Sequence, residues 1–406
     1  MNKTMNRIYE VLIVGGGFSG AVAACNLAER YGDAVALLER NPRLCKKVSA
    51  TGNGRCNITN ARVSADRYHS VCGANVENAL SRFDNRSLAE WFLSVGVPVC
   101  YEGDKAYPSS RQASSVAESL KDKLLYENAS VFYEFNCVGL KKDDDGLFIA
   151  QSGDGRTVTA RKAIIACGGK SGAQYGSDGS GYVLAKSLGH TVTATYPSIV
   201  QLITDKSAIK GLKGVKTEAD VTVFVGGKKT ASARGDVLFT DYGLSGNAIF
   251  SVSPYVVGNN DVTLALSFLP EYTQKRLEEI LIGKIETLPY ADGEKLLSGI
   301  VHGSLARAVY ALTDKGKSPY ALAARLAEKL KNFPVRVLGT LGFDGAQVTR
   351  GGVKFSEVNE STMESKLVDG LYVVGETLDV DGDCGGFNLQ WAYSSAMAAS
   401  EDLLKK

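Results

Sequence analysis

Residues 9–39 read YEVLIVGGGFSGAVAACNLAERYGDAVALLE, and this stretch decides the fold. The apolar run Tyr9–Val14 has the length of a buried strand, and the Ala-rich run Ala21–Arg30 has the composition of a helix. A second apolar run, Val35–Leu38, ends at Glu39. Strand, glycine turn, helix and strand in this order predict a βαβ unit, which begins a Rossmann-type α/β domain.

Three glycines, Gly15, Gly17 and Gly20, join the first strand to the helix at the spacing G-x-G-x-x-G. They permit a tight turn, close approach of the backbone to a pyrophosphate, and packing of helix on strand. Glu39, at the end of the second strand, is placed to accept hydrogen bonds from both ribose hydroxyls. The alternative is a glycine-rich turn without a nucleotide, but strand, glycines, helix and acid together predict a dinucleotide. Because a carboxylate repels the 2′-phosphate of NADP, FAD or NAD remains.

The chain has 406 residues, of which 44% are apolar and 22% charged, so two or three ordinary globular domains are expected. A net charge of +2 gives no reason to expect a nucleic acid or an anionic membrane as partner. The polar N-terminus MNKTMNRIYE lacks the apolar core of a signal peptide, and no apolar run approaches a bilayer span. We therefore expect a cytoplasmic protein. Eight cysteines without a CxxC, and only three histidines, predict no metal site.

The order of patterns along the chain predicts that its two ends share one domain. Residues 1–191 and 350–406 are assigned to this α/β domain. Within it, the apolar spacing predicts one helix near Val76–Val95, and short strands at Ser130–Val138, Thr157–Ala160 and Ala163–Ala166. Residues 192–269 and 334–349 alternate apolar and polar side chains and predict an inserted β-rich, barrel-like module. Residues 270–333 repeat apolar side chains every three or four positions and predict an inserted helical module.

The segment Ser49–Asn60, SATGNGRCNITN, is rich in glycine and small residues, so its backbone can lie close to a planar ligand. Arg55 offers a fixed cation, and Asn57 offers both a donor and an acceptor. The alternative is a polar surface loop with one buried cysteine. Cys56 has no second cysteine at the short spacing of a disulfide reductase, which argues against a dithiol mechanism.

Two further glycine turns follow predicted strands. Ala166-Cys167-Gly168-Gly169 would let the chain pass under a nucleotide, although an ordinary tight turn explains it equally well. Near the C-terminus, the strand 371–374 delivers Gly375 and Glu376, where an acid can bind ribityl hydroxyls.

Gly385-Gly386 then opens the final helix, predicted over Phe387–Leu403. The free amides of its first turn could face the N1–C2=O edge of a flavin. A helix N-terminus would stabilise the negative charge of that edge on reduction by roughly 0.3–2 kcal/mol. The alternative, a capped amphipathic helix, would not need the acid-rich loop that precedes it.

Taken together, these motifs resemble the BaiN-like flavoproteins, a bacterial FAD family with three domains. The resemblance covers nearly the whole chain and rests on GGGFSG, TGNGRCNITN, AYPSSRQASSV (106–116), ACGGKSG (166–172), VLFTDYGLSGNAI (237–249), VTRGGV (348–353) and GETLDVDGDCGGFNLQ (375–390). Members include proteins named 3-dehydro-bile acid reductases and aminoacetone oxidases. The resemblance is therefore specific for the family and not for a substrate. It implies a Rossmann-type FAD-binding domain formed by both chain ends, with a barrel-like and a helical insert.

The resemblance also implies which residues contact FAD. The residues that would touch the pyrophosphate are Gly15, Gly17, Ser19 and Gly20. Val138 would face the adenine through its backbone, and Glu376 would bind the ribityl chain. The full set of candidate cofactor-binding residues is Gly15, Gly17, Phe18, Ser19, Gly20, Glu39, Arg40, Gly54, Arg55, Cys56, Val138, Ala166, Gly168, Gly169, Gly375, Glu376, Gly386, Phe387, Asn388, Leu389 and Gln390. The candidate catalytic residues are Arg55, Cys56 and Asn57.

Three functions remain open. The first is an NAD(P)H-dependent reductase that transfers a hydride from flavin N5 to an activated C=C bond of a small molecule. The second is a flavin oxidase that passes electrons from an aminoacetone-like amine to O₂. The third is a non-catalytic FAD-binding redox sensor. The balanced charge disfavours flavin-dependent modification of RNA.

The sequence shows one dinucleotide fingerprint, so NAD(P)H would dock transiently, without a Rossmann domain of its own. No catalytic acid or base is assigned. His69, His190 and His302 are interpreted as structural, and Tyr101, Tyr107 and Tyr242 as packed or surface residues that could donate a proton. The oligomeric state is not predicted.

Overall fold

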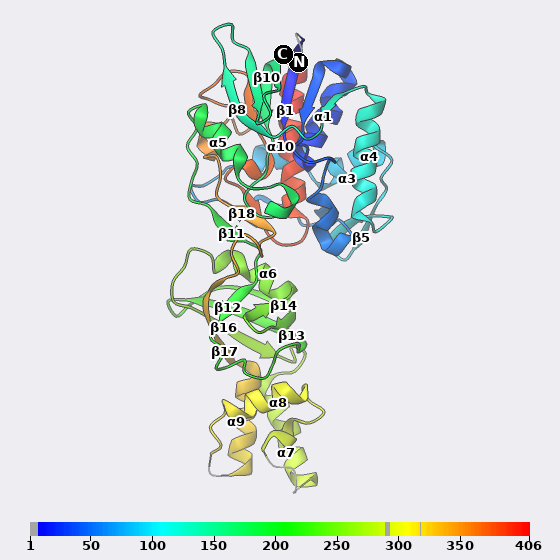
Figure 1. Ribbon diagram of the computed structural model, residues 1–406. Helices are drawn as coiled ribbons and strands as arrows, with labels where there is room; N and C mark the ends of the chain where they lie inside the picture. Colours follow the sequence, from blue (N-terminus) through cyan, green and yellow to red (C-terminus); the bar gives the residue numbers. More distant parts are fainter. Residues whose placement is uncertain (1–6, 289–292, 317) are drawn as a thin grey trace. The chain divides into compact units, whose positions relative to one another are not determined.

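The computed structural model describes residues 7–288, 293–316 and 318–406, and these form two compact units (Figure 1). Unit 1 combines both ends of the chain, up to Pro197 and from Gln347 onward. Unit 2 is the intervening segment, Ser198–Ala346. Residues 1–6 of the polar N-terminus, and residues 289–292 and 317 of the predicted helical insert, lie outside the described residues.

A seven-stranded sheet forms the centre of unit 1. Its strands are β1 (Ile8–Val14), β2 (Val35–Leu38), β7 (Ser130–Phe132), β8 (Cys137–Lys142), β9 (Phe148–Ser152), β10 (Thr157–Ile165) and β19 (Leu371–Val373). The order is β7-β2-β1-β10-β9-β8, and β19 also pairs with β10. Strands β7, β2, β1, β10 and β19 are parallel, whereas β9 and β8 are antiparallel additions. Every residue of β2 is buried, as expected for a parallel strand covered on both faces.

Helices from both ends of the chain cover this sheet. They are α1 (Phe18–Tyr31), α4 (Ala113–Tyr126), α5 (Ser180–Ser187) and α10 (Phe387–Lys405). The red α10 packs against the blue α1 (Figure 1). Its buried face carries Ser395, Ala396 and Ala399, whose small side chains permit close packing. The two chain ends therefore form one domain, as predicted.

Three small sheets extend unit 1. Their strands are β3 (Thr59–Asn60), β5 (Val99–Glu102) and β6 (Lys105–Pro108), then β4 (Tyr68–His69) with β20 (Asp381–Gly382), and β11 (Tyr196–Ser198) with β18 (Val348–Arg350). In the first of them, Thr59 pairs with Ala106. The first two of these sheets bring β3 and β20 against α10.

Three sequence-based assignments in unit 1 were wrong. The single helix predicted near Val76–Val95 is two helices, α2 (Glu77–Arg82) and α3 (Asn85–Ser94), because the Asp84 carboxylate accepts the amides of Arg86 and Ser87 and starts a new helix. The strand predicted over residues 130–138 is interrupted, with a left-handed residue at Glu134, where φ is 53°. The two strands predicted over residues 157–166 are the continuous β10.

Unit 2 contains a closed antiparallel barrel. Its strands are β12 (Leu202–Thr204), β13 (Lys216–Val225), β14 (Lys228–Phe239), β15 (Gly243–Ser245), β16 (Val262–Phe268) and β17 (Phe333–Thr340), in the order β12-β15-β14-β13-β16-β17. Every second residue of β16 is buried, which is the alternation read from the sequence. Unit 2 also contains the helices α6 (Asn247–Val252), α7 (Gln274–Thr287), α8 (Gly303–Ala311) and α9 (Pro319–Lys331). The predicted fold class, a Rossmann-type domain with a barrel-like insert, is confirmed.

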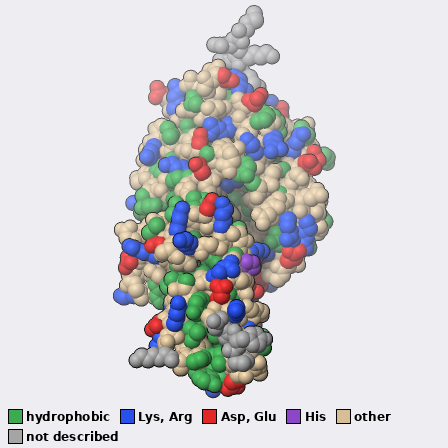
Figure 2. All heavy atoms as spheres, turned by 60° about the horizontal axis from the view of Figure 1, so that its bottom comes forward, with side chains coloured by type: hydrophobic (Ala, Val, Ile, Leu, Met, Phe, Trp, Pro, Cys, Tyr) green, Lys and Arg blue, Asp and Glu red, His purple; other side chains and the backbone are tan. Residues whose placement is uncertain are grey.

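The domain boundaries read from the sequence differ from the structural ones by a few residues. Strand β17 begins at Phe333, the last residue assigned to the helical insert, and the predicted boundary at 349/350 falls inside β18. On the face shown in Figure 2, Lys and Arg side chains are interspersed with Asp and Glu side chains. Within the described ranges, no helix combines the length and the hydropathy needed to cross a bilayer.

Candidate dinucleotide-binding site

The turn between β1 and α1 leaves no room for side chains on its inner face. Gly15 has a φ of 110°, and a Cβ atom on it would lie 2.5 Å from the carbonyl oxygen of Ala166. A Cβ atom on Gly20 would lie 1.8 Å from the carbonyl oxygen of Gly15. At Gly17, the N-cap of α1, a Cβ atom would meet open space. This open side lets a diphosphate reach the amides at the helix N-terminus.

Glu39 lies beside this turn and is 6% exposed. Its Oε2 accepts a hydrogen bond of 2.8 Å from the amide of Gly16, and its Oε1 accepts bonds of 2.6 and 2.7 Å from the backbone and side-chain nitrogens of Asn41. A carboxylate has about four lone-pair sites, so this group can still accept from a ribose hydroxyl. The neighbouring Arg40 pairs with Asp178 at 2.5 Å.

The second and third glycine turns meet at Glu376. A Cβ atom on Gly169 would lie 2.4 Å from Thr349 Oγ1 and 2.6 Å from Glu376 Oε1. Glu376 Oε1 accepts from the amide of Thr349 at 2.8 Å, and Oε2 accepts from Lys47 Nζ at 2.8 Å. A Cβ atom on Gly375 would lie 2.7 Å from Ser19 Oγ in α1. The fold thus joins residues that are more than 300 positions apart in the sequence.

The N-terminus of α10 carries amides that the helix itself cannot satisfy. Its first intrahelical bond runs from Gln390 N to the carbonyl oxygen of Gly386 at 3.1 Å, so the amides of residues 387–389 lack intrahelical acceptors. Asn57 Oδ1 accepts from the amide of Gly386 at 3.3 Å, and its Nδ2 donates to the carbonyl oxygens of Ala106 and Thr59. Asn57, predicted as a catalytic residue, therefore ties the loop before β3 to the start of α10.

The side chains of two predicted flavin contacts, Asn388 and Gln390, form hydrogen bonds with other residues of the protein. The Asn388 amide donates to and accepts from the backbone of Gly382 at 2.9 and 2.8 Å. Gln390 is fully buried, accepts from Thr59 Oγ1 at 2.5 Å and donates to the carbonyl oxygen of Phe83 at 2.8 Å. Their side chains fix the helix start, which leaves backbone amides as the groups able to meet a ligand.

The aromatic members of the predicted set also pack internally. Phe18 stacks on Phe92, with ring centroids 5.8 Å apart, and Phe387 meets Tyr68 edge to face at 6.1 Å. Leu389 is half-buried. The contribution of Phe18 and Phe387 to a dinucleotide site is therefore restricted to their backbone.

The acid-rich loop before α10 is held through three aspartates. Asp379 accepts from the amides of Val71 and Cys72, and Asp381 accepts two bonds, of 3.0 and 3.1 Å, from Arg350. Asp383 pairs with His69 at 2.7 Å and with Arg67 at 3.1 Å. Across the described part of the chain, no group of three His, Cys, Asp or Glu side chains is arranged to hold a metal ion. The loop acids therefore shape the approach to the helix.

Arg55 and Cys56 face different surroundings. Cys56 is 1% exposed with a φ of 59°, and burial raises the pKa of its thiol to about 11. At neutral pH this thiol is protonated, so the structure argues against Cys56 as a nucleophile. Arg55 is 41% exposed, pairs with Glu102 at 2.5 Å, and lies over the Tyr107 ring at 4.4 Å. At Gly54, a Cβ atom would meet open space.

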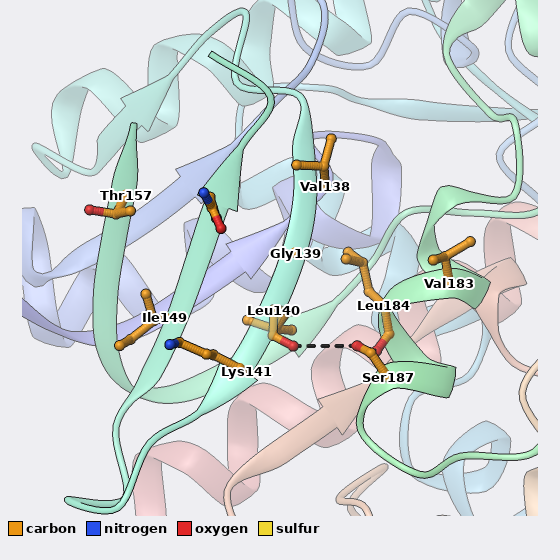
Figure 3. Close-up of a pocket in the computed structure, with 10 residues that line it drawn as sticks. Val138, Gly139, Leu140, Lys141, Ile149, Thr157, Val183, Leu184 and Ser187 are labelled. Atoms are coloured by element: carbon orange, nitrogen blue, oxygen red, sulfur yellow. Dashed lines mark hydrogen bonds between the residues drawn. The ribbon is translucent and has the colours of Figure 1, made fainter. Parts of the chain in front are cut away.

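Val138 lies apart from the glycine turns, on β8. The β8–β9 register shifts between Cys137 and Gly139, so Val138 has no Cα partner in the ladder. Its side chain is 54% exposed and lines a cavity of about 350 Å³ between β8, β9 and α5, together with Leu140, Ile149 and Leu184 (Figure 3). The backbone of a bulged residue is suited to the predicted adenine contact, which stays a prediction.

Comparison with known proteins identifies the family. The model of the HI0933-like protein Rossmann domain matches residues 9–402. The chain belongs to the HI0933-like family. It is 36% identical to the 3-dehydro-bile acid delta(4,6)-reductase of Clostridium scindens, over 97% of this chain and 98% of that protein. It is 29% identical to the ribosomal RNA dihydrouridine synthase of Escherichia coli K12, over 98% of each chain.

The HI0933-like chain also resembles a solved structure, the open conformation of a flavocytochrome c3 fumarate reductase. The TM-score is 0.52 at 16% identity, over 98% of this chain and 78% of that one. The predicted membership of the BaiN-like flavoproteins is confirmed, and with it the assignment as an FAD-dependent oxidoreductase. The individual FAD contacts stay predictions.

Sequence reasoning missed two residues that lie beside the candidate site residues of this HI0933-like chain. Thr349 is fully buried, and its hydroxyl accepts from the amides of Lys170 and Ser171 at 2.8 and 2.9 Å, which fixes the second glycine turn. Arg111 lies over the Tyr107 ring at 5.3 Å. Both belong to motifs, VTRGGV and AYPSSRQASSV, that support the family resemblance. Their place in these two motifs was the signal that the sequence offered.

Proposed function

We propose that this chain reduces a C=C bond conjugated to a carbonyl group, with electrons from NAD(P)H passing through FAD. One observation carries the proposal: two relatives that this chain matches along nearly their whole length have unrelated substrates, yet the name of each denotes saturation of such a bond. In a dienone of a 3-oxo steroid and in the uracil ring, the double bond is activated by a neighbouring carbonyl. The common chemistry is hydride addition to the carbon β to that carbonyl.

The residues of unit 1 suit the cofactor. Gly17 and the first amides of α1 would hold the pyrophosphate, and Glu39 would hold the ribose of the adenosine. Bound FAD would supply the hydride from N5. The amides of residues 387–389 would face the pyrimidine edge of the flavin, and the positive end of α10 would favour its reduced, anionic form by roughly 0.3–2 kcal/mol.

The electron donor is part of the proposal. One G-x-G-x-x-G turn occurs in the sequence, and we assign it to the binding of FAD. NAD(P)H would therefore dock transiently, reduce the flavin and leave before the small-molecule substrate enters.

Anaerobic mixing tests this function. The purified holoprotein is mixed with NADPH, with NADH and with aminoacetone, and the flavin absorbance is followed. We expect a nicotinamide to bleach the flavin and a cyclic enone to restore its colour. Bleaching by aminoacetone alone would support the oxidase instead. A flavin that no donor reduces, and that dithionite reduces without any later turnover, would support the redox sensor.

Reduction of uracil in RNA is a second candidate, favoured by the 29% identity to a ribosomal RNA dihydrouridine synthase over 98% of both chains. The net charge of +2 argues against a broadly basic RNA-binding protein, and the face shown in Figure 2 carries mixed charges. Incubation with ribosomal RNA fragments, NADPH and the holoprotein, followed by mass spectrometry of the nucleosides, decides between them. Formation of dihydrouridine at catalytic rates would establish the RNA substrate.

A further inference from the structure

We propose that Arg55 and Arg111, which both lie over the Tyr107 ring and against Glu102, bind the carbonyl oxygen of the substrate and stabilise it as it becomes an enolate oxygen. The inference rests on the proposed function, because it assigns the group that recognises the conjugated carbonyl.

Both guanidinium groups lie over one aromatic ring. Arg55 lies 4.4 Å and Arg111 lies 5.3 Å from the centroid of Tyr107, which is 8% exposed. The Arg side chains are 41% and 34% exposed, so parts of both are open to a small molecule, although Arg111 Nη1 itself is buried. We call Arg55, Tyr107, Arg111 and Glu102 the arginine cluster.

One carboxylate serves both cations. Arg55 Nη2 donates to Glu102 Oε2 at 2.5 Å. Arg111 Nη1 lies 2.9 Å from Glu102 Oε1 without hydrogen-bond geometry, and it has no acceptor among the described residues. Two positive charges against one negative charge leave the arginine cluster with a net positive charge. This is the arrangement that an oxygen anion requires.

The backbone holds these residues in unusual conformations. Arg111 and the residue after Arg55, Cys56, have φ values of 56° and 59°, which non-glycine residues rarely adopt. Such conformations concentrate at functional sites, where the surrounding structure maintains them.

A chain of neighbouring contacts connects the arginine cluster to the start of α10. Asn57 bridges the amide of Gly386 and the carbonyl oxygen of Ala106. Ala106 directly precedes Tyr107 on β6, and the Tyr107 ring lies 3.6 Å from where a Cβ atom on Gly52 would stand, within the segment Ser49–Asn60. The cluster is therefore attached to the segment expected to approach the flavin ring.

The chemistry balances without a further reagent. Bound, reduced FAD would supply a hydride to the β-carbon, the π electrons of the C=C bond would shift toward the carbonyl, and the oxygen would become negative. A proton from water would then bond to the α-carbon, restore the carbonyl and leave hydroxide. The substrate would gain two electrons and two hydrogens, of which the flavin gives both electrons and one hydrogen as hydride and water gives the other hydrogen as a proton. Arg55 and Arg111 act while the oxygen is negative, where fixed donors have their largest effect.

Binding of a non-reactive enolate mimic tests the site without turnover. The holoprotein is titrated with 4-cyanophenol, whose anion resembles an enolate, and the long-wavelength charge-transfer absorbance of the flavin is recorded. We expect binding with a charge-transfer band, weakened at least about tenfold in Arg111→Gln and Arg55→Gln. Arg111→Lys should retain part of the affinity. The control is Arg62→Gln, which removes an exposed arginine paired with Asp104 outside the cluster and should bind as the unmodified protein does.

A kinetic split distinguishes this inference from the proposed function. The flavin is photoreduced, so no nicotinamide is needed, and then mixed with cyclohex-2-enone or with ferricyanide. Arg111→Gln should slow reoxidation by the enone about 10²-fold and leave reoxidation by ferricyanide unchanged. An unmodified protein that no enone reoxidises would refute the proposed function, whereas phenolate binding would still test the anion site.

Two results would overturn the inference. One is equal phenolate affinity and equal enone rates in the unmodified protein and Arg111→Gln. The other is a loss that affects ferricyanide and enone alike, with a lowered Tm and FAD content, since this would make the cluster a structural network. Arg111→Lys, which keeps the charge, covers the case in which Arg111→Gln fails to fold.

Discussion

At the residue scale, glycines of the first turn do two different things, although the motif treats them alike. Gly20 is required because a side chain would enter the backbone of Gly15. Gly17 is required, in our proposal, because a side chain would occupy the place of the phosphates. Substitution of each glycine by alanine distinguishes the requirement for folding from the requirement for binding.

We expect Gly20→Ala to destabilise the apoprotein by about 1–3 kcal/mol or more, because its Cβ atom would lie 1.8 Å from a carbonyl oxygen. Gly17→Ala should leave the free energy of unfolding within about 0.5 kcal/mol and weaken FAD binding by at least about tenfold. Urea unfolding of the apoprotein and fluorescence titration with FAD measure the two effects. A Gly17→Ala protein that binds FAD normally would contradict the pyrophosphate assignment.

His190 provides a pH dependence. It is 4% exposed, its Nε2 lies 2.8 Å from Ser365 Oγ, and its Nδ1 lies 3.2 Å from Glu357 Oε2. Burial lowers the pKa of His190 below its usual 6.5. Burial by itself raises the pKa of Glu357, but hydrogen bonds from Thr191 and His190 lower it further than burial raises it. The Glu357 carboxyl therefore has a lowered pKa and stays ionised.

The sign of the effect follows from proton uptake. Below about pH 6.5 the unfolded chain binds a proton at residue 190 that the folded protein resists, so the free energy of unfolding falls as pH falls. We expect His190→Asn to make the decline between about pH 7 and about pH 5 shallower. Urea unfolding at several pH values measures the slope. Equal slopes in both proteins would show that His190 does not cause the decline.

At the element scale, a single side chain decides where α3 begins. The apolar spacing continues from α2 into α3, so periodicity predicts one helix. Asp84 ends that continuity because its carboxylate accepts the amides of Arg86 and Ser87. Asp84 is a typical N-cap residue, but the apolar spacing that continues across it favours a single helix.

We expect Asp84→Ala to lower the free energy of unfolding by about 0.5–2 kcal/mol, the usual value of an N-cap. The matched control is Asp122→Ala, because Asp122 is exposed on α4 and should change stability by less than about 0.5 kcal/mol. Urea unfolding of the holoprotein measures both variants. Equal stability of the two variants would mean that the cap adds nothing to the fold.

At the scale of the whole molecule, unit 1 and unit 2 each have a hydrophobic core. The first includes Leu12, Ile164 and Val373 of the central sheet, and the second includes Leu264 and Phe333 of the barrel. All the predicted FAD-binding residues belong to unit 1.

Calorimetry should therefore show two transitions, of which FAD shifts one. At a free FAD concentration 100 times its Kd, unit 1 should gain about 2.7 kcal/mol while the transition of the barrel stays in place. The apoprotein without added FAD is the control. A single transition that moves as a whole with FAD would show that the two units unfold together.

The sequence by itself determined the first βαβ unit and the barrel alternation, because each depends on neighbours a few positions apart. The order of patterns along the chain predicted that its two ends share one domain. Glycine spacing sets the turn from Gly15 to Gly20, and a period of two sets the faces of β16. The family resemblance added the cofactor.

Tertiary structure alone decided which side chains meet. Lys47 reaches Glu376 across 329 positions, Asn57 reaches the amide of Gly386, and Arg111 turns back over Tyr107 beside Arg55. None of these contacts can be read from neighbouring residues in the sequence, because an ion pair or a ring contact depends on which distant segments the fold brings together. Burial then fixed the chemistry, since Cys56 becomes an unreactive thiol and Arg55 a partly exposed cation only after the loop has folded around them.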